Sequence, residues 1–192
     1  MGTFTLTKSR FALLALAASL LLAMLGCNFN VGGPDSPPTP FSSSGNPFGE
    51  FEGLFENATI SGDGSFSVIL NEAQMTALVA ARLQLEDEPV ITNPVVLLQD
   101  GAIHLYGQVG EGLVSADGLI VIEPVINSDG SLAFSVASAD LGPLPVPDGL
   151  LASLSGMITE AFTGSIGPLA TGIRLTAVAI DNGEMAIQGQ VR

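Results

Sequence analysis

The segment DGAIHLYGQV, residues 100–109, returns near the C-terminus as NGEMAIQGQV, residues 182–191. Each copy begins with Asp-Gly or Asn-Gly, continues as an alternating pattern and ends in Gly-Gln-Val. Such dipeptides between alternating segments are typical of the turn of an antiparallel hairpin. A third turn of this kind, Ser128-Asp129-Gly130, lies between the two copies. The sequence therefore predicts three hairpins, so antiparallel strands are the main element of the fold.

The length of each turn decides which side chains share a face of the sheet. A loop of two residues and a loop of three that ends in Gly both fit these turns, and they give registers that differ by one position. In the middle hairpin, a three-residue loop pairs Ile126 with Leu132 and leaves Glu123 on the opposite face. In the last hairpin, a two-residue loop would place Asp181 opposite Glu184, a like-charge pair that destabilises. We therefore predict three-residue loops at all three turns. The further pairs predicted in this register are Pro124 with Phe134, Ile122 with Val136, Ala179 with Met185, Ala177 with Ile187, Ile173 with Val191, Val95 with Leu105 and Leu97 with Ile103.

This register leaves many apolar side chains on the face that points away from the core. A sheet face in contact with water is normally more polar. Either another part of the chain covers this face, or it binds an apolar ligand or another protein. The apolar residues expected there are Val96, Leu98, Val125, Val178 and Ile180, beside His104, Tyr106, Thr176 and Gln188.

Two amphipathic helices are expected between the strands. The first begins after Asn71, with Gln74 placed to complete a capping box, and ends before Pro89. The second follows Asp148 and keeps its apolar residues within one arc. The order of elements predicts an α+β domain, an antiparallel sheet of about six to seven strands with both helices packed on one face. A helix followed by a hairpin occurs twice, either as an internal repeat or as two separate solutions to one packing problem.

The first residues have the order of a secretory signal peptide. Lys8 and Arg10 precede an apolar run over residues 11–25, which ends at Gly26-Cys27. This run is shorter than the roughly 20 residues that a membrane-spanning helix needs. The segment LAMLGC, residues 22–27, resembles the lipobox of bacterial lipoproteins, which implies cleavage after residue 26 and a lipid on the sulfur of Cys27. Cys27 is the only Cys in the chain, so an internal disulfide is impossible. The alternative is a secreted protein with a free thiol.

Composition divides the rest of the chain into two parts. Residues 27–57 are rich in Pro, Gly, Ser and Asn, which predicts a tether between the lipidated Cys27 and the domain. Residues 48–56, FGEFEGLFE, interrupt this composition with aromatic side chains. They form either the disordered end of the tether or a short flap that docks on the domain. A single α+β domain is expected over residues 58–192.

The charge of the mature chain excludes one class of partner. Removal of residues 1–26 leaves three Arg, no Lys and all 19 acidic residues, a formal net charge of −16. A nucleic-acid-binding protein needs a basic surface, so no nucleic acid is expected as a partner. The same charge repels anionic headgroups. The chain is therefore expected to reach a membrane through its lipid anchor.

Few residues of the sequence are suited to catalysis or to binding a metal ion. His104 is the only His, and it has no second His and no Cys in the mature domain for a metal site or a thiol nucleophile. A hydrolytic triad around His104 lacks the usual context of a nucleophilic Ser. Acidic residues such as Asp129 and the run at 86–88 could bind a hard cation weakly, although turn formation explains them better. We expect no enzyme, no metal and no cofactor.

Three segments resemble small bacterial envelope proteins of the YpmS-like type: residues 65–80, 98–109 and 138–154. Such proteins are distantly similar to tubular lipid-binding (TULIP-like) domains, in which a curved sheet wraps a helix beside an apolar groove. The resemblance implies an extracytoplasmic lipoprotein that binds a lipid or another apolar ligand between helices and sheet. The alternative is an interaction or structural module of the cell envelope that docks on another envelope protein. The candidate wall of the ligand site consists of Leu150, Leu154, Met157, Ile158 and Phe162.

Overall fold

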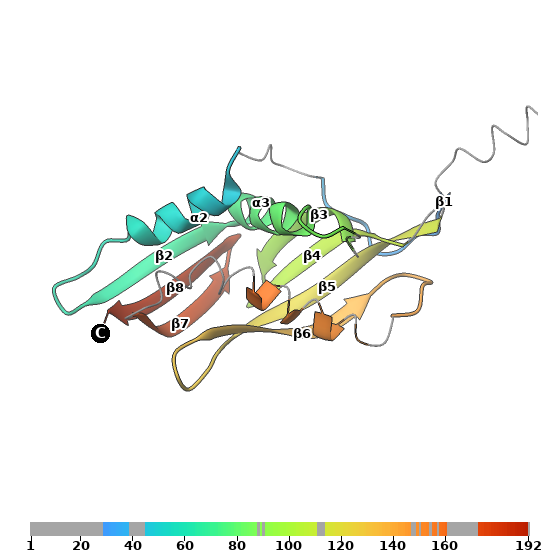
Figure 1. Ribbon diagram of the computed structural model, residues 1–192. Coiled ribbons are helices and arrows are strands. Elements are labelled where there is room, and N and C mark those ends of the chain that lie inside the picture. The colour runs from blue at the N-terminus through green and yellow to red at the C-terminus, as the bar shows by residue number, and fades with distance from the viewer. Residues whose placement is uncertain are drawn as a thin grey trace, which may run out of the picture.

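The computed structural model describes residues 29–38, 45–87, 89, 91–110, 114–146, 149, 151–153, 155–156, 158–160 and 173–191. The described residues form an elongated α+β fold with antiparallel sheets, which confirms the expected fold class (Figure 1). In addition to the elements below, the described residues between 151 and 160 are helical, and we call them the 151–160 segment. The elements are β1 (Phe29–Asn30), α2 (Pro47–Glu56), β2 (Ser65–Asn71), α3 (Glu72–Leu83), β3 (Ile91–Gln99), β4 (Ala102–Val109), β5 (Val114–Ile126), β6 (Leu132–Asp140), β7 (Ile173–Asp181) and β8 (Glu184–Val191).

The strands divide into two sheets, so the expectation of a single sheet is wrong. β3, β4, β5 and β6 form one antiparallel sheet, to which β1 adds a short parallel pair along the start of β5. The second sheet has three strands in the order β2-β8-β7. The sheets meet through turns rather than through paired strands: Gly183 N–H donates to Leu98 O and Leu175 N–H donates to Gly130 O, each at 3.0 Å.

Both outer edges of the β3–β6 sheet are closed by helices, which explains the division. On the β3 edge, the Val96 and Leu98 N–H groups donate to side chains of α3. On the β6 edge, the Phe134 and Val136 N–H groups donate to hydroxyls of the 151–160 segment. A strand can join a sheet only through free edge groups. The last hairpin therefore pairs with β2 instead.

The register predicted for the middle hairpin is confirmed. Ile126 pairs with Leu132, Pro124 with Phe134 and Ile122 with Val136. Within the turn, Gly130 alone has a positive φ, of 85°. The carboxylate of Asp129 accepts the Ser131 N–H and hydroxyl at 2.9 and 2.7 Å, and these bonds hold the turn together. The three-residue loop is thus the one expected from its Asp-Gly sequence.

The predicted loops of the first and last hairpins are wrong, because both turns have two residues. Gln99 pairs with Ala102, and Asp181 pairs with Glu184. In each turn the two central residues have positive φ: 54° and 75° at Asp100-Gly101, 51° and 81° at Asn182-Gly183. This backbone matches the right-handed twist of the flanking strands. Asp181 and Glu184 are both exposed, so water weakens their repulsion and turn geometry decides the register.

In the observed register, the side chains near the turn in β3 and β7 lie on the opposite face of the sheet from the one predicted. Val96, Leu98 and Ile180, expected outside, are buried in the core. Leu97, expected inside, pairs with His104 and is partly exposed. Val95 is buried as expected but pairs with Tyr106 instead of Leu105, so two further predicted pairs are wrong. The other two wrong pairs are Ala179 with Met185 and Ala177 with Ile187, since these partners pair with Ile180 and Val178. A bulge between Leu175 and Ala177 restores the predicted register at Ile173 and Val191, and that pair is confirmed.

The repeated Gly-Gln-Val has a packing explanation. Gly107 and Gly189 are both buried, and each leaves room for a large neighbour. A methyl group on Gly107 would collide with the Ile91 side chain, and one on Gly189 would lie 2.5 Å from the Phe66 ring. The two helix-hairpin units nevertheless lie in different sheets. The two segments are similar in sequence because both form the same turn and both need a glycine beside a large side chain. Their positions in different sheets give no support for an internal repeat.

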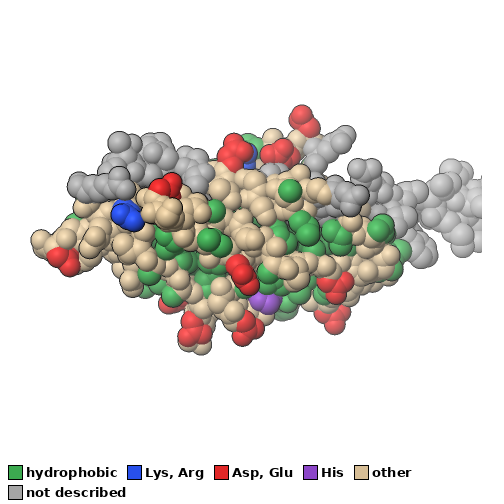
Figure 2. Space-filling view, turned by 90° about the horizontal axis from the view of Figure 1, so that it is seen from below, with side chains coloured by type: hydrophobic (Ala, Val, Ile, Leu, Met, Phe, Trp, Pro, Cys, Tyr) green, Lys and Arg blue, Asp and Glu red, His purple; other side chains and the backbone are tan. Residues whose placement is uncertain are grey.

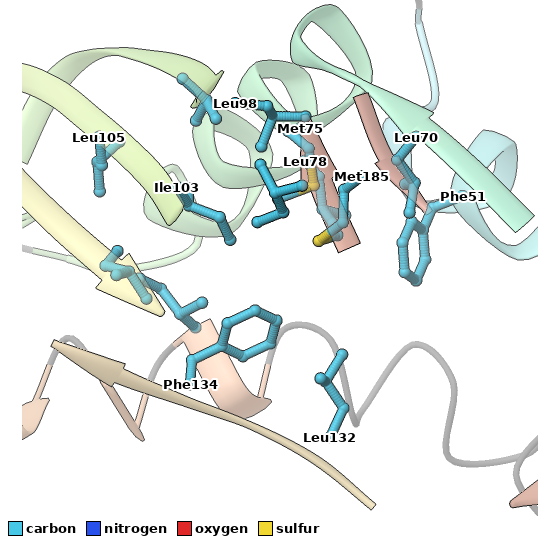
Figure 3. Packing of buried hydrophobic residues seen from close by; sticks show 14 of the residues in the cluster. Phe51, Leu70, Met75, Leu78, Leu98, Ile103, Leu105, Leu132, Phe134 and Met185 are labelled. Carbon is cyan, nitrogen blue, oxygen red and sulfur yellow. The ribbon is translucent and has the colours of Figure 1, made fainter. Parts of the chain in front are cut away.

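Helix α2 belongs to the packed structure. Its Phe51 and Phe55 rings lie 5.3 Å apart and are buried in the same cluster as the core of both sheets. Side chains from α2, α3 and the two sheets converge there (Figure 3). The aromatic stretch is thus a docked helix rather than the end of a tether, and the packed structure begins before residue 58.

Candidate functional site

Helix α3 is fixed at its start by a capping box. Asn71 Oδ1 accepts the Gln74 N–H at 2.9 Å, and Gln74 Oε1 accepts the Asn71 N–H at 3.0 Å, which confirms the cap predicted from the sequence. Met75 and Leu78 point from α3 into the core and are almost completely buried (Figure 3). The helix therefore has a defined rotation, with a separate face toward β3.

A ladder of side-chain hydrogen bonds joins that face to the edge of β3. Glu72 Oε1 accepts the Leu98 N–H and Thr76 Oγ1 accepts the Val96 N–H, each at 2.9 Å. Four residues of helix rise about 6 Å and two residues of strand about 6.6 Å, so the two spacings match. Because the helix number rises as the strand number falls, α3 runs antiparallel to β3.

The ladder ends where its third step would join Ala80 to Pro94. Alanine has no acceptor on its side chain, and proline has no N–H that needs one. The register of β3 shifts at the same place, between Thr92 and Val95, and Asn93 has a φ of 51°. Beyond the two bonded steps, the helix and the strand enclose an open groove.

This groove has a volume of about 350 Å³, which lies at the lower end of the range for small-molecule sites. Alanines at 73, 77 and 80 keep its helix side shallow, while Leu83 and Ile91 add larger apolar surface. The described residues that line it include no charged side chain. They are Ala73, Thr76, Ala77, Ala80, Leu83, Gln84, Pro89, Ile91, Thr92, Asn93 and Pro94.

The predicted ligand wall falls mostly outside the described residues. Ile158 is described, and its side chain is buried in the core cluster rather than in a groove. In the same segment, Ser155 and Thr159 hydroxyls accept the Val136 and Phe134 N–H groups at 3.3 and 3.2 Å. Side chains fill the space on the core side of α3, where Met75 and Leu78 lie (Figure 3). The remaining four, Leu150, Leu154, Met157 and Phe162, lie outside the described residues.

Arg82 joins the end of α3 to the 151–160 segment. Its guanidinium lies 3.4 Å from the Glu160 carboxylate and 3.9 Å from that of Glu86. Both partners are substantially exposed, so these ion pairs contribute little stability. They show that the two helical segments approach each other over the same core.

His104 lies on the outer face of the β3–β6 sheet, and the one side-chain hydrogen bond that the described part of the chain gives it is to an amide. Its Nδ1 is 3.4 Å from Gln99 Nε2. Elsewhere, the Asp129 carboxylate considered as a cation ligand is hydrogen bonded to the Ser131 hydroxyl and amide, which lower its pKa. Within the described ranges, no group of three or more His, Cys, Asp and Glu side chains could hold a metal ion.

The outer face of this sheet carries two apolar rows. Leu97 and Val121 flank His104, and Val95 and Leu119 flank Tyr106. Figure 2 looks at the molecule from this side and shows the single histidine among hydrophobic side chains, with acidic side chains around them. Of the five apolar residues expected on the outer face, only Val125 is exposed; Val96, Leu98 and Ile180 are buried, and Val178 packs against the core.

The proposed lipidation site, Cys27, lies outside the described residues. No helix in the described ranges is long and apolar enough to cross a membrane. No protein-family model matches the chain, and a search of curated proteins finds no match. The case for a function therefore depends on the chain's own residues.

Proposed function

We propose that this chain is a lipid-anchored, extracytoplasmic, non-enzymatic protein that binds the alkyl chain of a lipid or similar amphiphile in the groove between α3 and β3. The groove itself carries the proposal, because it is apolar, about 350 Å³ in volume and free of charge among its described lining residues. The signal-peptide-like order of the first residues, the lipobox-like segment ending at Cys27 and the distant resemblance to tubular lipid-binding domains support it.

The dimensions of the groove suit an unbranched chain. The residues that line the groove on the helix side run from Ala73 to Gln84, over which the helix axis advances about 16 Å. Burial of each methylene contributes about 0.8 kcal/mol, so an alkyl chain gains affinity in proportion to the length that enters. Thr92, Asn93 and Gln84 supply polar groups that could meet a headgroup.

Ala77→Phe tests this site, because a phenyl ring at position 77 would occupy the groove. The mature chain with Cys27→Ser, which cannot be acylated, is titrated with a fluorescent fatty acid. We expect the Kd to rise at least tenfold in Ala77→Phe, while the thermal unfolding curve shows that the variant remains folded.

The matched control is Ala152→Phe, which adds the same ring at an exposed helical position away from the groove. Its Kd should equal that of the parent protein. Failure of the parent to bind the fatty acid, or equal binding by Ala77→Phe, would contradict the proposal.

A second candidate function is an interaction module of the envelope, favoured by the apolar rows around His104 and Tyr106 (Figure 2). Correction of the register weakens this candidate, since Val96, Leu98 and Ile180 turn out to be buried within the chain. Of the remaining apolar residues, Val95 is buried, and Leu97, Leu119 and Val121 are only partly exposed. We therefore prefer the groove.

A further inference from the structure

The segment just after Cys27 is docked on the domain. β1 pairs with Val114 and Ser115 of β5. Val31 N–H then donates to Ser115 O at 2.8 Å, and Asp117 N–H donates to Gly32 O at 3.1 Å. The start of the segment predicted as a tether is thus attached to the domain at residues 29–33.

Close backbone packing fixes this attachment. Gly33 lies so near Asp117 that a Cβ at position 33 would collide with the Asp117 carbonyl oxygen. A Cβ on Gly142 would come within 2.8 Å of the Gly33 Cα atom and 3.0 Å of the Gly32 oxygen. Asn30 Nδ2 donates to Asp117 Oδ2 at 2.9 Å. Several independent contacts therefore hold residues 30–33 in one place.

The attachment point and the groove lie at the same end of the sheet. Ile91, at the groove, pairs with Val109, and Val109 pairs with Ala116. Ala116 directly follows the residues that pair with β1. Because α3 runs antiparallel to β3, its last residues also come to this end. The loop between α2 and β2 lies at the opposite end of the molecule (Figure 1).

We propose that the acyl anchor on Cys27 holds this end of the domain against the bilayer, so that the groove takes its ligand directly from that membrane. Only Asn28 lies between Cys27 and Phe29, which allows about 7 Å at most between the Cα atoms of Cys27 and Phe29. The occupant of the groove is a lipid of the bilayer that carries the anchor. This inference rests on the proposed function of the groove, and it adds that the ligand comes from the membrane to which the protein is anchored.

The surface at this end fits contact with lipid. Leu85, just past the end of α3, is 66% exposed, and Val31, beside β1, is 39% exposed. Large apolar side chains at such positions can enter the interface of a bilayer. Glu86, Asp87 and Asp117 lie near them and disfavour anionic headgroups. The lipid surface that fits best is therefore zwitterionic or uncharged.

Tryptophan fluorescence tests this orientation cleanly, because the chain contains no Trp. Leu85→Trp places a reporter at the anchored end, and Ile60→Trp places one at the opposite end, where Ile60 is 57% exposed. Each full-length protein is lipidated in cells and reconstituted in phosphatidylcholine vesicles whose acyl chains are brominated. We expect the bromine to quench Leu85→Trp at least threefold more strongly than Ile60→Trp. Equal quenching, or stronger quenching of Ile60→Trp, would overturn the proposal.

Fatty-acid binding by the same Trp variants, measured in solution with Cys27→Ser, separates the two proposals. If the fatty acid binds but Leu85→Trp is not quenched, the groove is a binding site and the orientation is wrong. If Leu85→Trp is quenched but no fatty acid binds, the orientation is supported and direct loading of the groove is wrong. Quenching together with binding supports both.

Discussion

Phe51→Ala is expected to lower the free energy of unfolding by about 3–5 kcal/mol, the usual cost of truncating a buried Phe. Phe51 is 3% exposed and contacts Phe55 within the main core cluster. Its loss would leave a cavity under α2, and the adjoining side chains could fill it only in part. Urea unfolding of the mature chain, followed by far-ultraviolet circular dichroism, measures this change.

Glu52→Ala is the control, since Glu52 belongs to the same helix but is exposed. Its effect should stay within about 0.5 kcal/mol. A tether that merely lies beside the domain would make both variants neutral. Neutral Phe51→Ala would therefore show that α2 is not part of the folded unit.

Leu98→Ala should cost about 2–5 kcal/mol, because this side chain is completely buried between α3 and the sheet. Its neighbour Leu97 points to the outer face beside His104 and remains partly exposed. Leu97→Ala should therefore cost only about 1 kcal/mol. The same unfolding measurement compares the two variants.

The comparison distinguishes the two possible registers of the first hairpin. A three-residue loop at residues 99–101 would bury Leu97 and expose Leu98, so the order of the two costs would be reversed. The reversed order would contradict the register on which the positions of β3 and the groove depend.

The length of a hairpin loop could be predicted only where a single feature of the sequence decided it. At Asp129-Gly130 the Asp side chain bonds to Ser131, and the prediction is confirmed. At Asn182-Gly183 the sequence allowed both loop lengths, and the like charges of Asp181 and Glu184 favoured the longer one. The backbone preference prevails, because a like-charge pair in water is worth less than a turn that matches strand twist.

The division into two sheets depends on contacts that are distant in sequence. Glu72 and Thr76 reach the β3 edge across more than 15 positions, and Ser155 and Thr159 reach the β6 edge in the same way. Each pair has a spacing of four residues, which places both side chains on one helical face. Polar residues at this spacing beside an apolar stripe were the available signal for a helix that closes a sheet edge.

The groove could not be located from apolar patterning, because its helix side consists of small residues. Ala73, Ala77 and Ala80 are ordinary helix formers, whereas the ligand wall was predicted on the larger apolar side chains of the other helix. Pro94 was the missing signal: a proline within a strand indicates an edge without a hydrogen-bonding partner. Facing Ala80, it marks where helix and strand separate.

Acyl-chain labelling tests the central claim most directly. The mature Cys27→Ser chain is illuminated with a fatty acid that carries a photoactivatable group along its chain, and the labelled residues are identified by mass spectrometry. The account predicts labels that are concentrated on residues 73–83 of α3, on Gln84, on Pro89 and on residues 91–94 of β3, and that are suppressed by excess unlabelled fatty acid. Saturable labelling confined to the outer face around His104, or to the 151–160 segment, would contradict it.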